Sequence, residues 1–225
     1  HEDLTQADKD TWLYQYCLTY LQRDLMDIAE IKDLNSFINA QNYLAINTGQ
    51  LINYSSIAKI AGISSMTAKK FSSYLEISYQ TITLQPWFKN LNKRLSKTPK
   101  IHFLDPGIQR SILRRKGEIN GNEFESAVVA EIYKQTKNIG LNIIFFHLRT
   151  LDGREVDLVL EFEAGYVLIE IKKSQKVRRE DSRHLRNIED IFDKPIIGSF
   201  LLSEDNNLQF FGKNVYAVPA AWFLS

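Results

Sequence analysis

The chain has 225 residues, of which 44% are hydrophobic and 24% charged, and its formal net charge is +1 at pH 7. These values are typical of a globular protein with one large or two small domains, and they exclude a disordered tail, a collagen-like fibre and a disulfide scaffold. The small net charge hides an uneven distribution: residues 1–40 carry 3 basic and 8 acidic side chains, residues 41–100 carry 8 and 1, and residues 101–225 carry 17 and 18. Such asymmetry bears on binding partners rather than on the fold.

Residues 8–34 are predicted to form one long helix, because apolar side chains recur every three or four residues. Acidic side chains occupy much of the opposite face, and the simplest interpretation is a packing helix with a solvated acidic side. The N-terminus is acidic and polar, unlike a signal peptide, and it lacks an initiator Met. We therefore expect a fragment or a processed chain.

Residues 36–61 are predicted to form two shorter helices, the second of which would end at Gly62. A third helix follows, with Ser64 or Ser65 as its N-cap. Residues 79–87 then alternate apolar and polar side chains as a strand does. This order of elements is that of a helix-turn-helix with a wing, and it predicts a helical, winged-helix-like module.

The third of these helices would enter the major groove of DNA. Its outward side chains, which can contact phosphates or base edges, are expected to be Thr67, Lys69, Lys70 and Ser73. The following stretch would add basic residues, namely Lys89, Lys93, Arg94, Lys97 and Lys100. Binding should weaken steeply with salt, because phosphate contacts release counterions. The alternative is a three-helix bundle whose lysines only keep it in solution.

Residues 101–225 mix predicted helices and strands, and we expect an α/β domain with a mixed sheet there. One helix is predicted to begin after Gly121 and another to lie at residues 180–193. Five runs rich in β-branched and aromatic residues are the predicted strands. We therefore expect a domain boundary at residue 100, between a helical domain (residues 1–100) and an α/β domain.

Residues 155–174 are predicted to be a β-hairpin that turns at Ala164 and Gly165 and has one wholly apolar face. On the other face Asp157 would lie across from Lys172, with Glu170 as its diagonal neighbour. The simpler interpretation is an amphipathic hairpin with a salt bridge on its solvent side. The functional interpretation is a divalent metal site, because Mg²⁺ prefers oxygen ligands and takes one or two protein carboxylates. Such an ion polarises a phosphoryl oxygen, and a nearby lysine stabilises charge that develops on phosphate.

The spacing of Asp157 and the tripeptide Glu170-Ile171-Lys172 resembles the D-(D/E)xK signature of the restriction-endonuclease-like nuclease superfamily. The preceding helix GNEFESAVVAEI resembles the helix that often supplies a further carboxylate there. The resemblance implies that Asp157 and Glu170 are ligands of Mg²⁺ or Mn²⁺, that Lys172 is the catalytic lysine, and that Glu125 is the helix carboxylate.

The order of sequence blocks from Thr19 to Ser174 resembles the C-terminal region of bacterial and archaeal AAA-type ATPases, in which a P-loop ATPase domain precedes a conserved domain of unknown function. The resemblance implies an α+β protein, in which a winged-helix-like module precedes a PD-(D/E)xK restriction-endonuclease-like domain. No phosphate-loop motif occurs in this chain. We therefore expect no ATP site here and a P-loop ATPase domain that is missing from this chain.

A basic segment follows the hairpin and is expected either to clamp the DNA backbone beside the metal site or to form a solvated helix face. The residues expected to contact DNA are Lys173, Lys176, Arg178 and Arg179. The single cysteine, Cys17, excludes an intrachain disulfide and fits a reducing compartment, so we expect a cytoplasmic protein. The four scattered histidines offer no zinc site of the usual spacing, and no apolar run is long enough for a membrane span.

Three hypotheses follow for the function. The preferred one is a DNA-binding, Mg²⁺-dependent nuclease-like module of an AAA-type ATPase-family protein. The second is a DNA-binding module without catalysis, acting as a regulator attached to the ATPase. The third is a protein-interaction or homo-oligomerisation module, in which the acidic N-terminal helix contacts a partner or a neighbouring copy of the chain.

Overall fold

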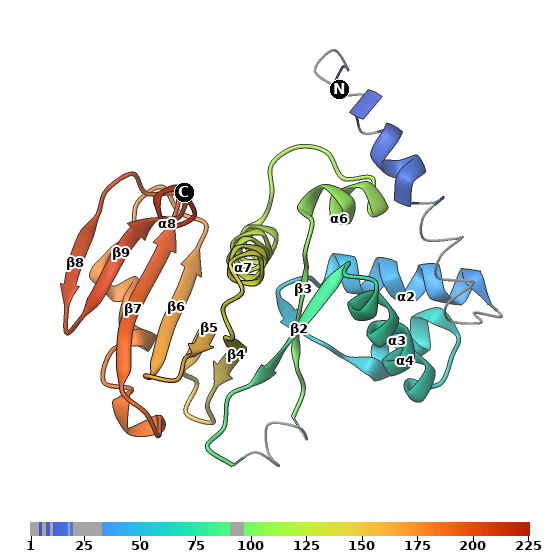
Figure 1. Ribbon diagram of the computed structural model, residues 1–225. Coiled ribbons are helices and arrows are strands. Elements are labelled where there is room, and N and C mark those ends of the chain that lie inside the picture. The colour runs from blue at the N-terminus through green and yellow to red at the C-terminus, as the bar shows by residue number, and fades with distance from the viewer. Residues whose placement is uncertain (1–4, 6–7, 10, 18, 20–32, 91–96) are drawn as a thin grey trace. The chain divides into compact units, whose positions relative to one another are not determined.

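The computed structural model describes the chain except for residues 1–4, 6–7, 10, 18, 20–32 and 91–96. It contains two compact units: unit 1 comprises His1–Ile82 and Ile101–Glu118, and unit 2 comprises Thr83–Lys100 and Ile119–Ser225. Each unit is built from two separate stretches of the sequence, because Thr83–Lys100 belongs to unit 2 and Ile101–Glu118, which follows it, belongs to unit 1. Helices and a mixed sheet are both present, which confirms the expected mixture of helices and strands (Figure 1).

Unit 1 is built around three helices, α2 (Leu34–Ile46), α3 (Tyr54–Ala61) and α4 (Ser65–Ile77) (Figure 1). Each begins at a polar N-cap whose side chain accepts a hydrogen bond from a backbone N–H of the first turn; the caps are Asp33, Asn53 and Ser64. Gly62 ends α3 in the left-handed conformation, as predicted. Of the long helix predicted over residues 8–34, much lies outside the described residues, and Thr11–Cys17 are helical.

The core of unit 1 is apolar and is shared by all three helices. Two short strands, β1 (Gln50–Leu51) and β3 (Lys100–Phe103), and the helix α6 (Pro106–Ile112) complete the unit, except that Lys100, the first residue of β3, belongs to unit 2. The largest fully buried side chains in this core are Phe37, Leu44, Ile57, Leu75, Ile101 and Phe103. The helices α2, α3 and α4 and the turn at Gly62 lie in the stretch in which the sequence predicts three helices.

Unit 2 is organised on a mixed sheet with the strand order β2-β4-β5-β6-β7-β9-β8, to which β2 contributes its last residues. The strands are β2 (Thr81–Pro86), β4 (Ile144–Arg149), β5 (Glu155–Glu161), β6 (Tyr166–Lys172), β7 (Ile196–Ser203), β8 (Gln209–Gly212) and β9 (Val215–Pro219). The pairs β2–β4, β6–β7 and β7–β9 are parallel. The pairs β4–β5, β5–β6 and β8–β9 are antiparallel.

The described residues of unit 2 include the helix α7 (Gly121–Asn138) and the short α8 (Ala220–Phe223), and α7 contacts β6 (Figure 1). The prediction of one helix at residues 180–193 is wrong. This stretch contains two short 3₁₀ helices instead, η1 (Arg179–Leu185) and η2 (Glu189–Ile191). Asn187 interrupts them with a left-handed φ of 52°. The guanidinium of Arg154 donates hydrogen bonds to the carbonyl oxygens of Arg186 and Asn187, with N–O distances of 3.0 and 2.7 Å. These carbonyl groups therefore have hydrogen-bond partners although they lie outside a helix. No helix of the described residues is long and apolar enough to cross a membrane.

The β5–β6 hairpin has a register different from the predicted one. Leu158 pairs with Ile169 and Leu160 with Val167, so the predicted alignment of Asp157 with Lys172 is wrong. The turn is longer than predicted, and it closes with a hydrogen bond of 2.9 Å from the N–H of Phe162 to the carbonyl oxygen of Gly165. Because this shift is of two residues, every side chain keeps its predicted face.

Both faces of the hairpin are buried. Leu158 and Ile169 on one face are fully buried, and so are Val159 and Leu168 on the other. A sheet covered on both sides explains why the strands are nearly continuous apolar runs. The interpretation of a hairpin with a salt bridge on a solvent side is therefore wrong, and polar groups on either face need partners within the protein.

Candidate active site

A pocket of about 500 Å³ lies in unit 2, where the first turns of α7, the adjoining parts of β5 and β6, and η1 come together. Four residues predicted from the sequence line it: Glu125, Asp157, Glu170 and Lys172. They come from one helix and two strands, so the fold alone brings them together.

Each carboxylate is positioned by a regular element. Asn120 and Glu123 form a capping box at the start of α7, and this fixes the turn that carries Glu125. Asp157 lies near the start of β5, where its Oδ2 accepts a hydrogen bond of 2.9 Å from the N–H of Ile171 on β6. Glu170 precedes Ile171 on β6, and the observed register, if continued by one pair, sets it opposite Asp157.

Lys100 joins two of these carboxylates. Its Nζ lies 2.5 Å from Oε1 of Glu125 and 3.1 Å from Oδ1 of Asp157. The three side chains are only 14%, 11% and 14% exposed. Burial lowers the pKa of Lys100, but Asp157 and Glu125 outweigh it and raise this pKa overall, so the ammonium stays charged. The sequence predicts Lys100 only as one of several basic residues near DNA, because its approach to α7 and β5 is a tertiary contact.

The third carboxylate has no such contact. Oε2 of Glu170 is buried and makes no hydrogen bond to any residue that the structure describes. Burial, followed by the charge of Asp157, raises the pKa of Glu170 well above its ordinary value. The same two causes raise the pKa of Glu125 to about 8, although Lys100 acts in the opposite direction. Three carboxyl groups thus line the pocket, and the one ammonium of Lys100 pairs with two of them.

Lys172 points to a different partner. Its ammonium forms an ion pair with Asp181 of η1, and its side chain is 47% exposed. Asp181 also accepts a hydrogen bond of 2.8 Å from the N–H of Arg178, which fixes the start of η1. Lys172 therefore lies at the rim of the pocket and not between the carboxylates.

The donor chemistry of the pocket fits a hard divalent cation, because all three groups offer carboxylate oxygens and one of these oxygens is buried without a hydrogen bond. Among the described residues, however, no group of three or more histidine, cysteine, aspartate or glutamate side chains is spaced to hold a metal ion. The oxygens of Glu125 and Asp157 are arranged around the ammonium of Lys100 instead.

The pocket also contains basic residues beyond those predicted. Arg183 and His184 of η1 line it, and so does Lys173, which is half-buried and is one of the predicted DNA contacts. Nδ1 of His184 accepts a long hydrogen bond of 3.4 Å from the N–H of Glu155. Burial and the neighbouring Arg183 lower the pKa of His184. The predicted DNA contacts Lys176, Arg178 and Arg179 are all exposed.

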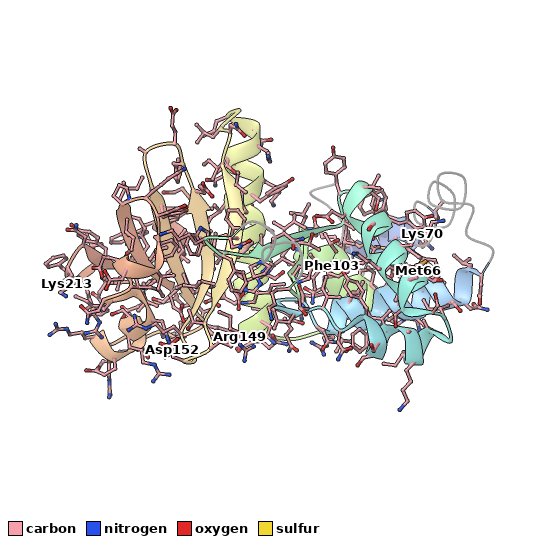
Figure 2. All side chains as sticks on the ribbon, turned by 90° about the horizontal axis from the view of Figure 1, so that it is seen from below. Met66, Lys70, Phe103, Arg149, Asp152 and Lys213 are labelled. Atoms are coloured by element: carbon pink, nitrogen blue, oxygen red, sulfur yellow. The ribbon has the colours of Figure 1, made fainter. Side chains whose placement is uncertain are left out.

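The DNA contacts predicted for unit 1 lie mostly on one side of α4. Lys69, Lys70 and Ser73 are exposed, and Figure 2 shows Lys70 on this helix. Thr67 is half-buried, and its hydroxyl forms a hydrogen bond of 2.9 Å with that of Ser64 at the N-cap. Of the following basic stretch, Lys97 is exposed. Lys93 and Arg94 lie outside the described residues.

Comparison with known proteins matches both halves of the chain to families without an assigned function. Residues 1–118 match the family model of a domain of unknown function, DUF8612, and residues 120–223 match that of another, DUF4143. DUF4143 is typically found in AAA-ATPase-associated proteins.

Curated relatives are longer than this chain. The uncharacterized proteins Mb2031c of Mycobacterium bovis and Rv2008c of Mycobacterium tuberculosis are each 26% identical to it over 178 residues, covering 76% of the chain and 39% of their own length. An uncharacterized protein of Haemophilus influenzae is 21% identical over 194 residues, covering 84% of the chain and 47% of its own length. The chain thus spans less than half the length of these relatives.

Among solved structures, protein VC1899 from Vibrio cholerae aligns with a TM-score of 0.28 and 16% identity, over 89% of this chain and 48% of its own. This likeness is too weak to identify the fold.

Proposed function

The chain belongs to the family of the domain of unknown function DUF8612, and we propose that it is a DNA-binding module that hydrolyses phosphodiester bonds with a divalent metal. The observation that carries the proposal is the pocket in which Glu125, Asp157 and Glu170 converge, with a buried oxygen of Glu170 that bonds to no described residue. Burying a carboxylate without a partner is costly, and a bound cation is what offsets that cost most directly.

In this proposal Asp157 and Glu170 hold the ion, as the D-(D/E)xK resemblance implies. The ion would supply polarisation of a phosphoryl oxygen and a bound water of lowered pKa. Glu125, whose pKa is raised to about 8, holds or accepts a proton near neutral pH. Lys172 and Arg183 at the rim bind phosphate oxygens and stabilise the charge that develops on them.

We also propose the wider setting of this module. Unit 1 would act as a winged-helix-like DNA-binding element through α4, and unit 2 as a restriction-endonuclease-like domain. The module formed by both units would follow a P-loop ATPase domain in a longer protein, which agrees with the association of DUF4143 with AAA-type ATPases.

A second candidate function is a DNA-binding or regulatory module without catalysis. Two contacts favour it: Lys100 occupies the position between Glu125 and Asp157, and the ammonium of Lys172 is paired with Asp181. A fold of this kind can keep a catalytic signature while losing the reaction. The two candidates make opposite predictions for DNA cleavage.

The test is a cleavage assay on supercoiled, branched and single-stranded DNA with Mg²⁺ or Mn²⁺, comparing wild type with Asp157→Asn. The matched control is Asp152→Asn, which makes the same charge change at an exposed position of the β4–β5 turn (Figure 2). We expect the wild type and the control to cleave DNA at similar rates. Asp157→Asn should cleave at least about 100-fold more slowly, which is the typical effect of removing a group that acts on the reacting atoms. Equal background rates for all three proteins, together with salt-dependent DNA binding, would favour the second candidate.

A further inference from the structure

The position of Lys100 has a consequence for metal binding. Its ammonium lies at the point where carboxylate oxygens of α7 and β5 converge, within hydrogen-bond distance of both. Lys100 reaches this point from β3, and it is 57 residues distant from Asp157 in the sequence. An ammonium with two carboxylate partners in a nearly buried setting is held firmly, since each contact is charge-assisted.

An ammonium and a divalent ion cannot use the same oxygens together. Mg²⁺ binds carboxylate oxygen at about 2.0–2.1 Å, so an ion on Oδ1 of Asp157 would lie against the Nζ of Lys100. Two positive centres this close repel each other strongly where water is largely excluded. Occupancy by one therefore opposes occupancy by the other.

The ammonium of Lys100 provides a partner for only two of the three carboxyl groups in the pocket. Lys100 contacts Glu125 and Asp157, whereas the buried Oε2 of Glu170 bonds to no described residue. A divalent ion held by Asp157 and Glu170 would give Glu170 the partner that the ammonium does not provide. The pocket thus has a resident cation that pairs with two of its carboxyl groups and leaves an oxygen of the third without a hydrogen bond to any described residue.

We propose that Lys100 is a resident counter-ion of the carboxylate pocket, and that a divalent metal binds there only by displacing its ammonium from Glu125 and Asp157. This inference rests on the proposed function insofar as that function supplies the metal. It makes Lys100 a positioning residue that sets the affinity of the site for metal, a role distinct from any contact with DNA.

The test measures Mn²⁺ binding to the whole 225-residue chain by calorimetry, without nucleic acid. Lys100→Met removes the charge and keeps a long unbranched side chain. We expect its Kd for Mn²⁺ to be at least about tenfold lower than that of the wild type, which corresponds to about 1.4 kcal/mol. The control is Lys194→Met, which removes a lysine that pairs with Glu161 at 2.9 Å at the far end of β5, and its Kd should equal that of the wild type.

A second pair of variants keeps the test decisive if Lys100→Met does not fold. In the background of Glu125→Gln, in which this side chain cannot ionise, the addition of Lys100→Met should again tighten Mn²⁺ binding. Folding of each variant is checked by circular dichroism. An unchanged or weaker affinity after removal of Lys100, in either background, would overturn the inference.

The outcome is distinguishable from failure of the proposed function. Tighter Mn²⁺ binding by Lys100→Met without DNA cleavage by any protein would retain the counter-ion role and reject the nuclease. DNA cleavage by the wild type, combined with equal Mn²⁺ affinities of wild type and Lys100→Met, would retain the nuclease and reject the counter-ion role.

Discussion

Replacing Glu125 by glutamine should change how the stability of the protein depends on pH. Burial and the charge of Asp157 raise the pKa of Glu125 to about 8, whereas its ordinary value is 4.5. Between these two values the folded protein holds a proton that the unfolded chain has released. The contribution of the Glu125 carboxyl to the free energy of unfolding is therefore fully present below about pH 4.5 and is lost as the pH rises to about 8. The glutamine variant cannot ionise and should lack this loss.

The size of the effect follows from the shift. Each pKa unit corresponds to about 1.4 kcal/mol, so the difference between 4.5 and about 8 sets an upper limit of about 5 kcal/mol. The ion pair with Lys100 is already included in that value, because Lys100 lowers the pKa of Glu125. We therefore expect the free energy of unfolding of Glu125→Gln, relative to the wild type, to rise by up to this amount between about pH 5 and about pH 8.

Urea denaturation followed by circular dichroism measures this difference, with EDTA present so that no divalent ion contributes. The control is Glu163→Gln, which makes the same side-chain change at an exposed position of the β5–β6 turn. If the difference between Glu125→Gln and the wild type is the same at about pH 5 and about pH 8, the carboxyl is not protonated in the folded pocket and the electrostatic description given above is refuted.

Three further predictions concern the elements that position the site and the helix that we propose to bind DNA. Asn120→Ala removes the N-cap of α7 and should lower the free energy of unfolding in urea by about 1 kcal/mol; an unchanged value would mean that the capping box adds nothing. At Gly165, which has a φ of 153°, an added Cβ would lie 2.2 Å from the carbonyl oxygen of Pro195, so Gly165→Ala should cost about 1–3 kcal/mol, and an unchanged Tm would contradict this turn geometry. Lys69→Ala combined with Lys70→Ala should weaken DNA binding in fluorescence anisotropy and reduce the slope of log affinity against log salt by about 1–2, whereas an equal slope would exclude α4 from the phosphate contacts.

Local signals explain what the sequence predicts correctly about the fold. Gly62 and Ser64 specify the α3–α4 turn through their own conformation and side-chain hydrogen bond, so neighbouring residues are sufficient to place it. The helix after Gly121 is specified in the same way by its capping box. The grouping of Asp157 and Glu170 on one hairpin face also follows from local alternation, and it holds in spite of the wrong register.

Tertiary contacts explain what the sequence does not predict. The hairpin register depends on the length of the turn that ends at Gly165, which the residue types there leave open. The break between η1 and η2 depends on Arg154, more than 30 residues away, which binds the carbonyl oxygens near Asn187. The approach of Lys100 to Glu125 and Asp157 likewise joins three separate elements, and no spacing in the sequence encodes it.

The central claim is that the carboxylate pocket of unit 2 is a divalent metal site, and anomalous diffraction from a crystal soaked in Mn²⁺ tests it most directly. The account predicts an anomalous peak bonded to carboxylate oxygens of Asp157 and Glu170, with the ammonium of Lys100 moved away from Asp157. An absence of any peak at saturating Mn²⁺, with Lys100 still bridging Glu125 and Asp157, would contradict it.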